Sequence, residues 1–224
     1  YARQDRKARP RQPITSKLVA DLLEKAGASR VITMELHATQ IQGFFNIPAD
    51  DISALSIIGK YFKEKNLDDI VVVSPDHGGT TRARKLAEML HAPIAIIDKR
   101  RPKPNVAEAM NLIGEVDGKT AIIVDDIVDT AGTLISGVDM LYRMGAKEVY
   151  ASCVHGVLSG PAIERLDNSR IVEFICTNTI PQKSKQALLP KMKVLSVGLI
   201  LGQTIKQMEE NKSVSEILTQ LEAQ

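Results

Sequence analysis

The stretch TAIIVDDIVDTAGT, residues 120–133, decides the fold that we expect. It begins with an apolar run, continues with two aspartates, and ends in a turn of acidic, hydroxyl and small residues that leads into a helical pattern. A continuous apolar strand followed by a helix is typical of a parallel sheet covered on both faces. Ligands bind such sheets at the carboxyl ends of the strands, which is where the polar residues of this stretch lie.

The same alternation of strand and helix runs along the whole chain. Apolar spacing predicts helices at 14–26, 52–65, 80–91, 133–145, 160–167 and 198–211, and strands at 30–36, 69–75, 93–98, 120–126, 148–157, 170–178 and 193–197. We therefore predict an α/β fold of parallel sheets flanked by helices. Segments 99–109 and 181–191 are predicted to be mobile loops.

The composition is that of an ordinary globular protein. Of 224 residues, 44% are hydrophobic and 25% are charged, and the net charge of +2 indicates neither a nucleic-acid nor a membrane partner. No apolar run approaches the ~20 residues that would span a bilayer. Cys153 and Cys176 lie in apolar strand-like contexts, which favours buried free thiols in a reducing compartment, and so the cytoplasm.

The turn after the central strand is a candidate anion site. It consists of Asp129, Thr130, Ala131, Gly132 and Thr133. Backbone N–H groups at a helix start point toward an anion, and Gly132 lets the backbone approach closely. A plain Asp or Thr helix cap is the simpler alternative. The doublet Asp125 and Asp126 favours a functional site, because a ligand with both a phosphate and hydroxyl groups would suit the turn and the acids together.

A second loop, SPDHGGTTRARK at 74–85, repeats this design. Gly78 and Gly79 can bend the backbone around phosphate oxygens, and Asp76 is a candidate ligand for magnesium, which prefers oxygen. A glycine turn with a threonine cap is the alternative here.

The basic segment DKRRPKPN, residues 98–105, follows the next strand. A solvated charge run is the usual explanation of such a cluster. At the edge where two phosphate loops meet, however, Lys99 and Arg101 could offset charge on a transferring phosphoryl group, on a flap that closes over the substrate.

Two further stretches carry candidate binding groups. His37 ends a strand in ELHATQIQGFF, residues 35–45, and a structural role for it is the alternative. Arg3 and Gln4 of YARQDRK could hold a nucleotide through bidentate hydrogen bonds, or form part of a basic surface arm.

These five stretches, in their order along the chain, resemble the class I ribose-phosphate pyrophosphokinases (phosphoribosyl pyrophosphate, or PRPP, synthases) of bacteria. The resemblance implies two phosphoribosyltransferase-like domains. Residues 1–53 would be the remainder of the first domain, 54–207 the second, and 208–224 a tail that packs back on the first. Because YARQDRK lies well inside family sequences and no initiator Met is present, we expect part of the first domain to be missing from this chain.

The resemblance also implies a reaction, in which the diphosphoryl group of ATP passes to the 1-hydroxyl of ribose 5-phosphate. Arg3, Gln4 and His37 would bind ATP, His37 and Asp76 would bind Mg²⁺, and Asp76, Gly78 and Gly79 would form the diphosphate loop. Lys99 and Arg101 would be catalytic. Ribose 5-phosphate would be bound by Asp125, Asp126, Asp129, Thr130, Ala131, Gly132 and Thr133.

Family members assemble as dimers packed into hexamers, with phosphate as an activator and often with inhibition by ADP. Gln42, Ser213 and Ser215 match positions tied to that regulatory site. The segment after IPAD departs from the family pattern, with an unusual Asp51, which leaves ADP inhibition and assembly open.

Three other functions remain open at this stage. A phosphoribosyltransferase would share VDDIVDTAGT but needs neither YARQDRK nor ELHATQIQGFF. A non-catalytic partner of active synthases would fit the fold, although such relatives tend to interrupt the flap, which is unbroken here. A nucleic-acid-binding module ranks last, since basic residues cluster only at 3–17 and 99–103.

Overall fold

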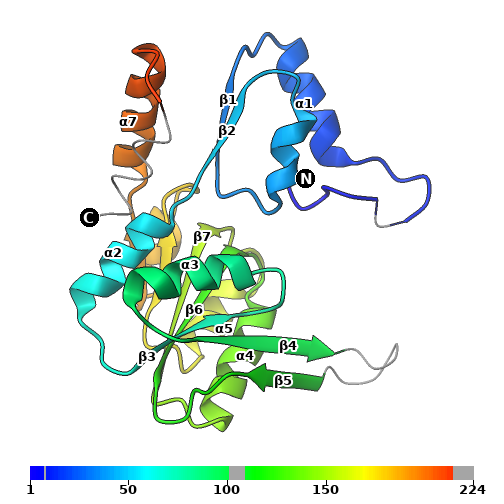
Figure 1. The fold of residues 1–224 in the computed structure, drawn as a ribbon. Coiled ribbons are helices and arrows are strands. Elements are labelled where there is room, and N and C mark those ends of the chain that lie inside the picture. Colours follow the sequence, from blue (N-terminus) through cyan, green and yellow to red (C-terminus); the bar gives the residue numbers. More distant parts are fainter. Residues whose placement is uncertain (8, 101–108, 214–224) are drawn as a thin grey trace. The chain divides into compact units, whose positions relative to one another are not determined.

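A computed structural model describes residues 1–7, 9–100 and 109–213 of the chain. The chain divides into two compact units, the first comprising Tyr1–Ala54 and the second beginning at Leu55. The two units are described separately (Figure 1). Within the described parts of the chain, no helix is long and apolar enough to cross a membrane.

The first unit pairs a short parallel sheet with a helix. It contains α1 (Thr15–Lys25), β1 (Val31–Met34), the 3-10 helix η1 (Thr39–Phe44) and β2 (Ala49–Ile52). The strands β1 and β2 are parallel, with Val31 opposite Ala49. The strand β2 was not predicted, because the sequence ADDI places two acids where an apolar run was sought.

The second unit is built on a seven-stranded sheet in the order β5-β4-β3-β6-β7-β8-β9. The strands are β3 (Ile70–Ser74), β4 (Ile94–Arg100), β5 (Ala109–Ile113), β6 (Thr120–Val128), β7 (Glu148–Gly156), β8 (Phe174–Thr177) and β9 (Met192–Leu195). The helices are α2 (Leu55–Lys65), α3 (Thr80–Leu90), α4 (Gly132–Arg143), α5 (Ala162–Asp167), α6 (Lys183–Gln186) and α7 (Gly198–Glu209). All neighbouring strands run parallel except β5, which pairs antiparallel with β4.

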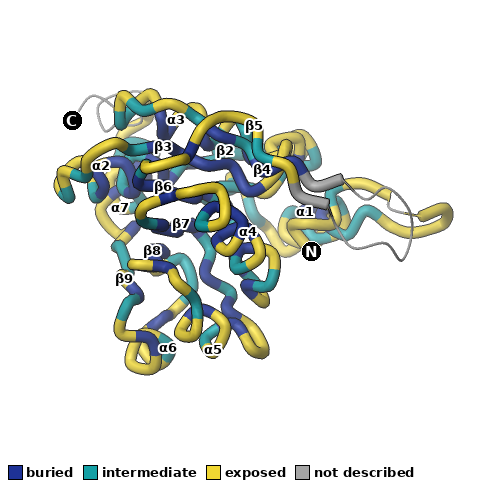
Figure 2. The backbone as a smooth tube through the Cα atoms, turned by 90° about the horizontal axis from the view of Figure 1, so that it is seen from below, coloured by how far each residue is buried: buried dark blue, intermediate teal, exposed yellow. Residues whose placement is uncertain are grey.

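The middle of this sheet forms the core of the unit. Val71, Val73, Ile123 and Ala151 on β3, β6 and β7 are fully buried. Helices α2 and α3 lie on one face of the sheet, and α4 and α5 lie on the other (Figures 1 and 2). Both faces are therefore covered, which explains why the central strands are apolar without alternation.

The structure differs from the sequence prediction in the two segments expected to be loops. Lys99 and Arg100 continue β4, and Ala109 begins β5, so all the described residues of 99–109 are strand, while 101–108 lie outside the described residues. Within 181–191, the short helix α6 occupies Lys183–Gln186. The predicted loops were wrong at these places because the β4–β5 pairing is set by contacts between segments that no local pattern displays.

Parallel pairing places the ends of several strands together. The carboxyl ends of β3, β4, β6 and β7 lie at the same edge of the sheet, since each pair of neighbours among them is parallel. Because β3 and β6 are direct neighbours, the turns that follow them begin side by side.

Candidate active site

The turn after β3 is held by its own side chains. The Gly79 N–H donates to Oδ1 of Asp76 at 2.9 Å, and the Ser74 hydroxyl donates to the Asp76 carbonyl at 2.6 Å. Gly78 and Gly79 have ordinary negative φ angles, so the bend does not depend on glycine's conformational freedom. Instead, a Cβ on Gly79 would lie 2.9 Å from the Ser74 oxygen, which makes the position one of close packing. The exposed Asp76 carboxylate is thereby oriented at the edge of the sheet.

His77 connects this turn to the next strand. Its Nε2 lies 2.9 Å from Oδ1 of Asp98, and Asp98 is 7% exposed. Asp98 directly precedes Lys99 on β4, so the backbone of Lys99 is fixed at the same edge as the turn. The side chain of Lys99 and all of Arg101 lie outside the described residues.

The acidic doublet lies near the carboxyl end of β6, where its two carboxyl groups interact strongly. Asp126 is 4% exposed, and its N–H donates to Oδ1 of Asp125 at 2.9 Å. Burial and the neighbouring Asp126 raise the pKa of Asp125 to about 8, although Arg82 opposes the rise. The pair therefore retains more protons near neutral pH than two exposed aspartates would.

Arg82 of α3 lies close to both the turn after β3 and the acidic pair of β6. Its Nη1 lies 3.8 Å from Oδ1 of Asp125 and 3.6 Å from Oδ1 of Asp126. A Cβ on Gly79 would lie 3.8 Å from the same nitrogen. The guanidinium thus lies between the turn after β3 and the acids of β6, with 13% of its side chain exposed.

The turn after β6 has the geometry of an anion cradle at the start of α4. Ala131 precedes the helix in the left-handed conformation, with φ of 59°, while Gly132 does not require positive φ. The hydroxyl-bearing Thr130 and Thr133 are exposed. The Ser159 hydroxyl donates to the carboxylate of Asp129, and Arg165 donates to the Thr130 carbonyl at 2.8 Å.

Sequence reasoning missed Arg82, Ser159 and Arg165. Arg82 could have been noticed as a cation in the first turn of a helix that follows a phosphate-type loop. Ser159 and Arg165 belong to SGPAIER, which follows β7 at the same edge, but this stretch was recognised only as a helix.

In the first unit, the segment that contains Arg3 and Gln4 is held by hydrogen bonds. The Gln40 amide donates to Asp5 at 2.6 Å, and the Ser16 hydroxyl donates to the Gln4 carbonyl at 2.8 Å, so the segment of Arg3 and Gln4 is tied to η1 and α1. His37 is exposed directly after β1. The unusual Asp51 accepts the Leu36 N–H at 3.1 Å, which fixes the backbone before His37.

The regulatory candidates are only partly described. Gln42 lies in η1, where its amide donates to the Thr39 carbonyl at 3.4 Å, and Ser213 is exposed after α7. Ser215 lies outside the described residues.

Residues 1–7, 9–100 and 109–213 contain no group of three or more His, Cys, Asp or Glu side chains that could hold a metal ion. Magnesium commonly needs only one or two carboxylates, with water and substrate phosphates completing its shell. The exposed, oriented Asp76 fits that kind of site.

Comparison with known proteins gives consistent relatives. Residues 99–219 match the family model described as phosphoribosyl synthetase-associated domain, and residues 1–27 match the N-terminal domain of ribose phosphate pyrophosphokinase. The ribose-phosphate pyrophosphokinase of Oceanobacillus iheyensis is 61% identical over 215 residues, which cover 96% of this chain and 68% of the relative. That of Bacillus subtilis is 61% identical over 217 residues, with the same coverage.

A solved structure agrees with these relatives. The crystal structure of phosphoribosylpyrophosphate synthetase from Mycobacterium smegmatis matches with a TM-score of 0.87 and 43% identity. The match covers 94% of this chain and 69% of that one.

Proposed function

The chain belongs to the ribose-phosphate pyrophosphokinase family, and from this premise we propose how its residues carry out the family's reaction. The activity is transfer of the β,γ-diphosphoryl group of ATP to the 1-hydroxyl of ribose 5-phosphate, which forms PRPP and AMP for nucleotide biosynthesis. One observation carries the proposal: two anion-type turns follow neighbouring parallel strands, and Arg82 lies between the turn after β3 and the acidic pair of β6.

Ribose 5-phosphate is bound by the end of β6 and the turn beyond it. The N–H groups of residues 129–133 and the exposed threonine hydroxyls suit the 5-phosphate, because a helix start attracts anions. Asp125 and Asp126 suit the sugar hydroxyls. A carboxyl pair that keeps a proton near neutral pH can both donate to and accept from a diol.

ATP-binding residues are proposed in each unit separately. In the second unit, Asp76, Gly78 and Gly79 of the turn after β3 bind the diphosphoryl group, and Asp76 would hold Mg²⁺. In the first unit, Arg3, Gln4 and His37 bind the nucleotide, and His37 is a further candidate ligand for Mg²⁺. When bound, the ion offsets charge on the triphosphate.

The chemistry is an in-line displacement. The 1-hydroxyl oxygen bonds to the β-phosphorus and releases its proton to water, the bond from that phosphorus to the oxygen bridging the α-phosphate breaks, and AMP leaves with the bridging oxygen. Lys99 and Arg101 stabilise the negative charge that is redistributed in the transition state. Lys99 lies near the carboxyl end of β4, at the same edge of the sheet as the turn after β3, which supports this role. The remaining task of the site is to position the two substrates.

Assembly and location are also part of the proposal. We expect self-association into dimers and hexamers, with inorganic phosphate as an activator acting through the region of Gln42, Ser213 and Ser215. Residues 1–53 are proposed as the remainder of an N-terminal phosphoribosyltransferase-like domain, 54–207 as the C-terminal domain, and 208–224 as its tail. The free, buried thiols of Cys153 and Cys176 support a cytoplasmic location.

The activity is tested on the full-length protein with ATP, ribose 5-phosphate, Mg²⁺ and phosphate. We expect AMP and PRPP in equal amounts, and no AMP when ribose 5-phosphate is omitted. Binding of both substrates without formation of AMP would instead favour a non-catalytic partner of active synthases.

The assignment of the 5-phosphate is tested by Thr133→Ala. Removal of one hydroxyl donor should raise KM for ribose 5-phosphate about tenfold and leave KM for ATP unchanged, because one hydrogen bond to a charged group is worth about 1.5 kcal/mol. Ser136→Ala is the matched control, since that hydroxyl is bound within α4 to the Gly132 carbonyl.

A further inference from the structure

The outer side of the turn after β6 is held by the segment that follows β7. The Leu158 N–H donates to the Val128 carbonyl at 3.1 Å, and the Ser159 N–H donates to the Asp129 carbonyl at 2.9 Å. Arg165 continues this series by donating from Nη1 to the Thr130 carbonyl at 2.8 Å. Three consecutive carbonyls of the turn therefore have partners on the same neighbouring segment.

These contacts fix the directions of the amides that face an anion. In a trans peptide unit the C=O and the N–H point in opposite directions, and no cis peptide occurs in the described residues. The Thr130 carbonyl shares its peptide unit with the Ala131 N–H. By holding that carbonyl, Arg165 directs the Ala131 N–H away from α5.

The backbone at this point needs such support. Ala131 has φ of 59°, a conformation that residues with a Cβ adopt only under constraint. Arg165 also approaches the next residue closely, because a Cβ on Gly132 would lie 3.2 Å from Nη1. Gly132 thus leaves room for the guanidinium, a role that its position in the sequence did not reveal.

The charge of Arg165 adds to its geometric effect. A guanidinium donates a charge-assisted hydrogen bond, and it polarises the peptide unit whose oxygen it holds. The N–H of that unit then becomes a stronger donor. The positive charge of Arg165 also adds to the positive potential at the start of α4, and both favour an anion in the turn.

We propose that Arg165 is a positioning residue for ribose 5-phosphate, which acts by orienting the Thr130–Ala131 peptide toward the 5-phosphate without touching the substrate. The proposal rests on the assignment of the turn to the 5-phosphate. It gives α5 a function in substrate binding in addition to its contribution to the fold.

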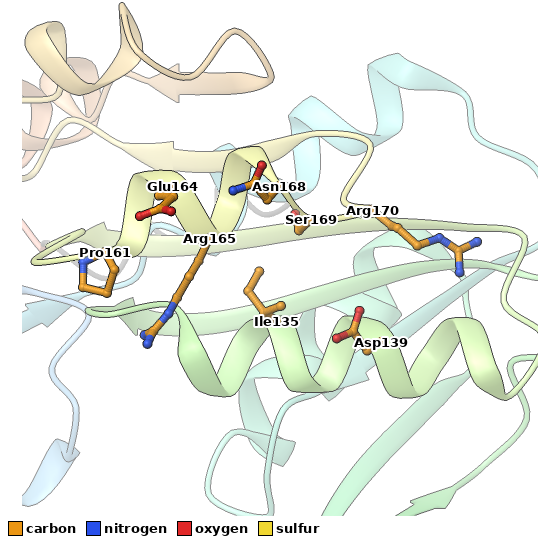
Figure 3. A pocket seen from close by; sticks show the side chains of 8 residues that line it. All are labelled: Ile135, Asp139, Pro161, Glu164, Arg165, Asn168, Ser169 and Arg170. Carbon is orange, nitrogen blue, oxygen red and sulfur yellow. The ribbon is translucent and has the colours of Figure 1, made fainter.

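Arg165 lines an open surface groove beside α4 and α5, so its side chain can be replaced without opening the core. Figure 3 shows Arg165 directed toward the N-terminal end of α4, with Arg170 at the other end of the groove. The groove has a volume of about 380 Å³ and is open, so water can replace the guanidinium at the Thr130 carbonyl. Removal of Arg165 should therefore affect ligand binding far more than folding.

Arg170 provides a matched control in the same groove. Its guanidinium lies 3.7 Å from the centre of the Tyr142 ring and contacts a different part of α4. Arg170→Ala removes an exposed arginine of the same chemistry and leaves the turn after β6 untouched.

The experiment measures both KM values and the melting temperature in the full-length protein. Arg165→Ala should raise KM for ribose 5-phosphate about tenfold, the effect of about 1.4 kcal/mol, with KM for ATP and the melting temperature unchanged. Arg165→Lys should retain part of the affinity that alanine loses, since a cation that can donate a hydrogen bond to the Thr130 carbonyl remains. If the alanine variant does not fold, Arg165→Gln, which keeps a neutral donor, replaces it in the comparison of KM values with Arg165→Lys.

The outcomes separate this proposal from the proposed function. If Thr133→Ala raises KM for ribose 5-phosphate but the Arg165 variants do not, the positioning role is overturned and the assignment of the turn remains. If neither residue affects that KM, both are overturned. The proposal is also overturned if the variants raise the KM values for ribose 5-phosphate and ATP equally, or if Arg165→Lys raises KM for ribose 5-phosphate as much as Arg165→Ala. Either result would indicate a purely structural arginine.

Discussion

Replacement of Asp125 by asparagine should stabilise this protein while it removes substrate binding. The carboxyl lies at the end of β6 with 28% of its side chain exposed, next to Asp126. Burial and Asp126 raise its pKa from the ordinary 3.8 to about 8, against the opposing effect of Arg82. Asparagine has nearly the same shape, no charge, and an Oδ1 that can still accept the Asp126 N–H.

The sign and size of the effect follow from this shift. Because the pKa is higher in the folded state, the folded state binds the proton more tightly, and stability falls as the pH rises from about 4 to about 8. Each pH unit in that window costs about 1.4 kcal/mol, which amounts to about 4 kcal/mol between pH 5 and pH 8. The variant also loses the ion pair between Arg82 and Asp125, which reduces the gain in stability. We expect Asp125→Asn to be more stable than the parent at pH 8 by about 2–4 kcal/mol, with the difference shrinking toward pH 4.

Urea unfolding of both proteins at pH 5, 6, 7 and 8, without substrates, measures this difference. Asp139→Asn, at an exposed position on α4, is the control, and its difference in stability from the parent should not increase with pH. The reasoning is refuted if the variant is less stable than the parent at pH 8, or if the difference is the same at pH 5 and pH 8. A titration with ribose 5-phosphate should show weakened binding, because the amide, unlike the carboxyl pair, cannot exchange donor and acceptor roles toward the diol.

Three further predictions test other parts of the site. Lys99→Ala should lower turnover at least roughly a hundredfold and spare ribose 5-phosphate binding, as expected for a contact made mainly in the transition state; single-turnover kinetics would show this. Gly79→Ala should raise KM for ATP, because the new methyl would lie 2.9 Å from the Ser74 oxygen and displace the turn; unchanged ATP kinetics would contradict it. Burial raises the pKa of both Cys153 and Cys176, so neither thiol should react with a disulfide reagent until urea unfolds the protein.

The sequence predicted the fold class because the central strands are buried on both faces. Val71–Val73 and Ile122–Val124 show no alternation, and that pattern is confirmed as parallel sheet. The resemblance to ribose-phosphate pyrophosphokinases is likewise confirmed by the relatives. The strand Ala109–Ile113 was missed because an antiparallel edge strand depends on its partner more than on its own residues.

The loops of the candidate site were predictable from the sequence, but the arginines that contact the site from neighbouring helices were not. Adjacent motifs revealed Asp76 and Asp125, since each directly follows an apolar strand. Arg82 and Arg165 reach the loops across helix–sheet packing, and no local spacing shows where a long side chain ends. The expected use of glycine was also incomplete: Ala131 takes the left-handed conformation, while Gly132 makes room for a guanidinium. The individual binding roles remain predictions.

The direct pairing of β3 with β6 has a consequence for selectivity. Val72 lies opposite Ile122, and paired strands are about 4.8 Å apart whatever their side chains. If the two loops bind the substrates as proposed, substitutions in either loop would change the affinity for one charged group, whereas the backbone spacing of the strands would set the distance between the two charged groups. Selectivity for the length of the substrate pair would then depend on the sheet more than on the loop side chains.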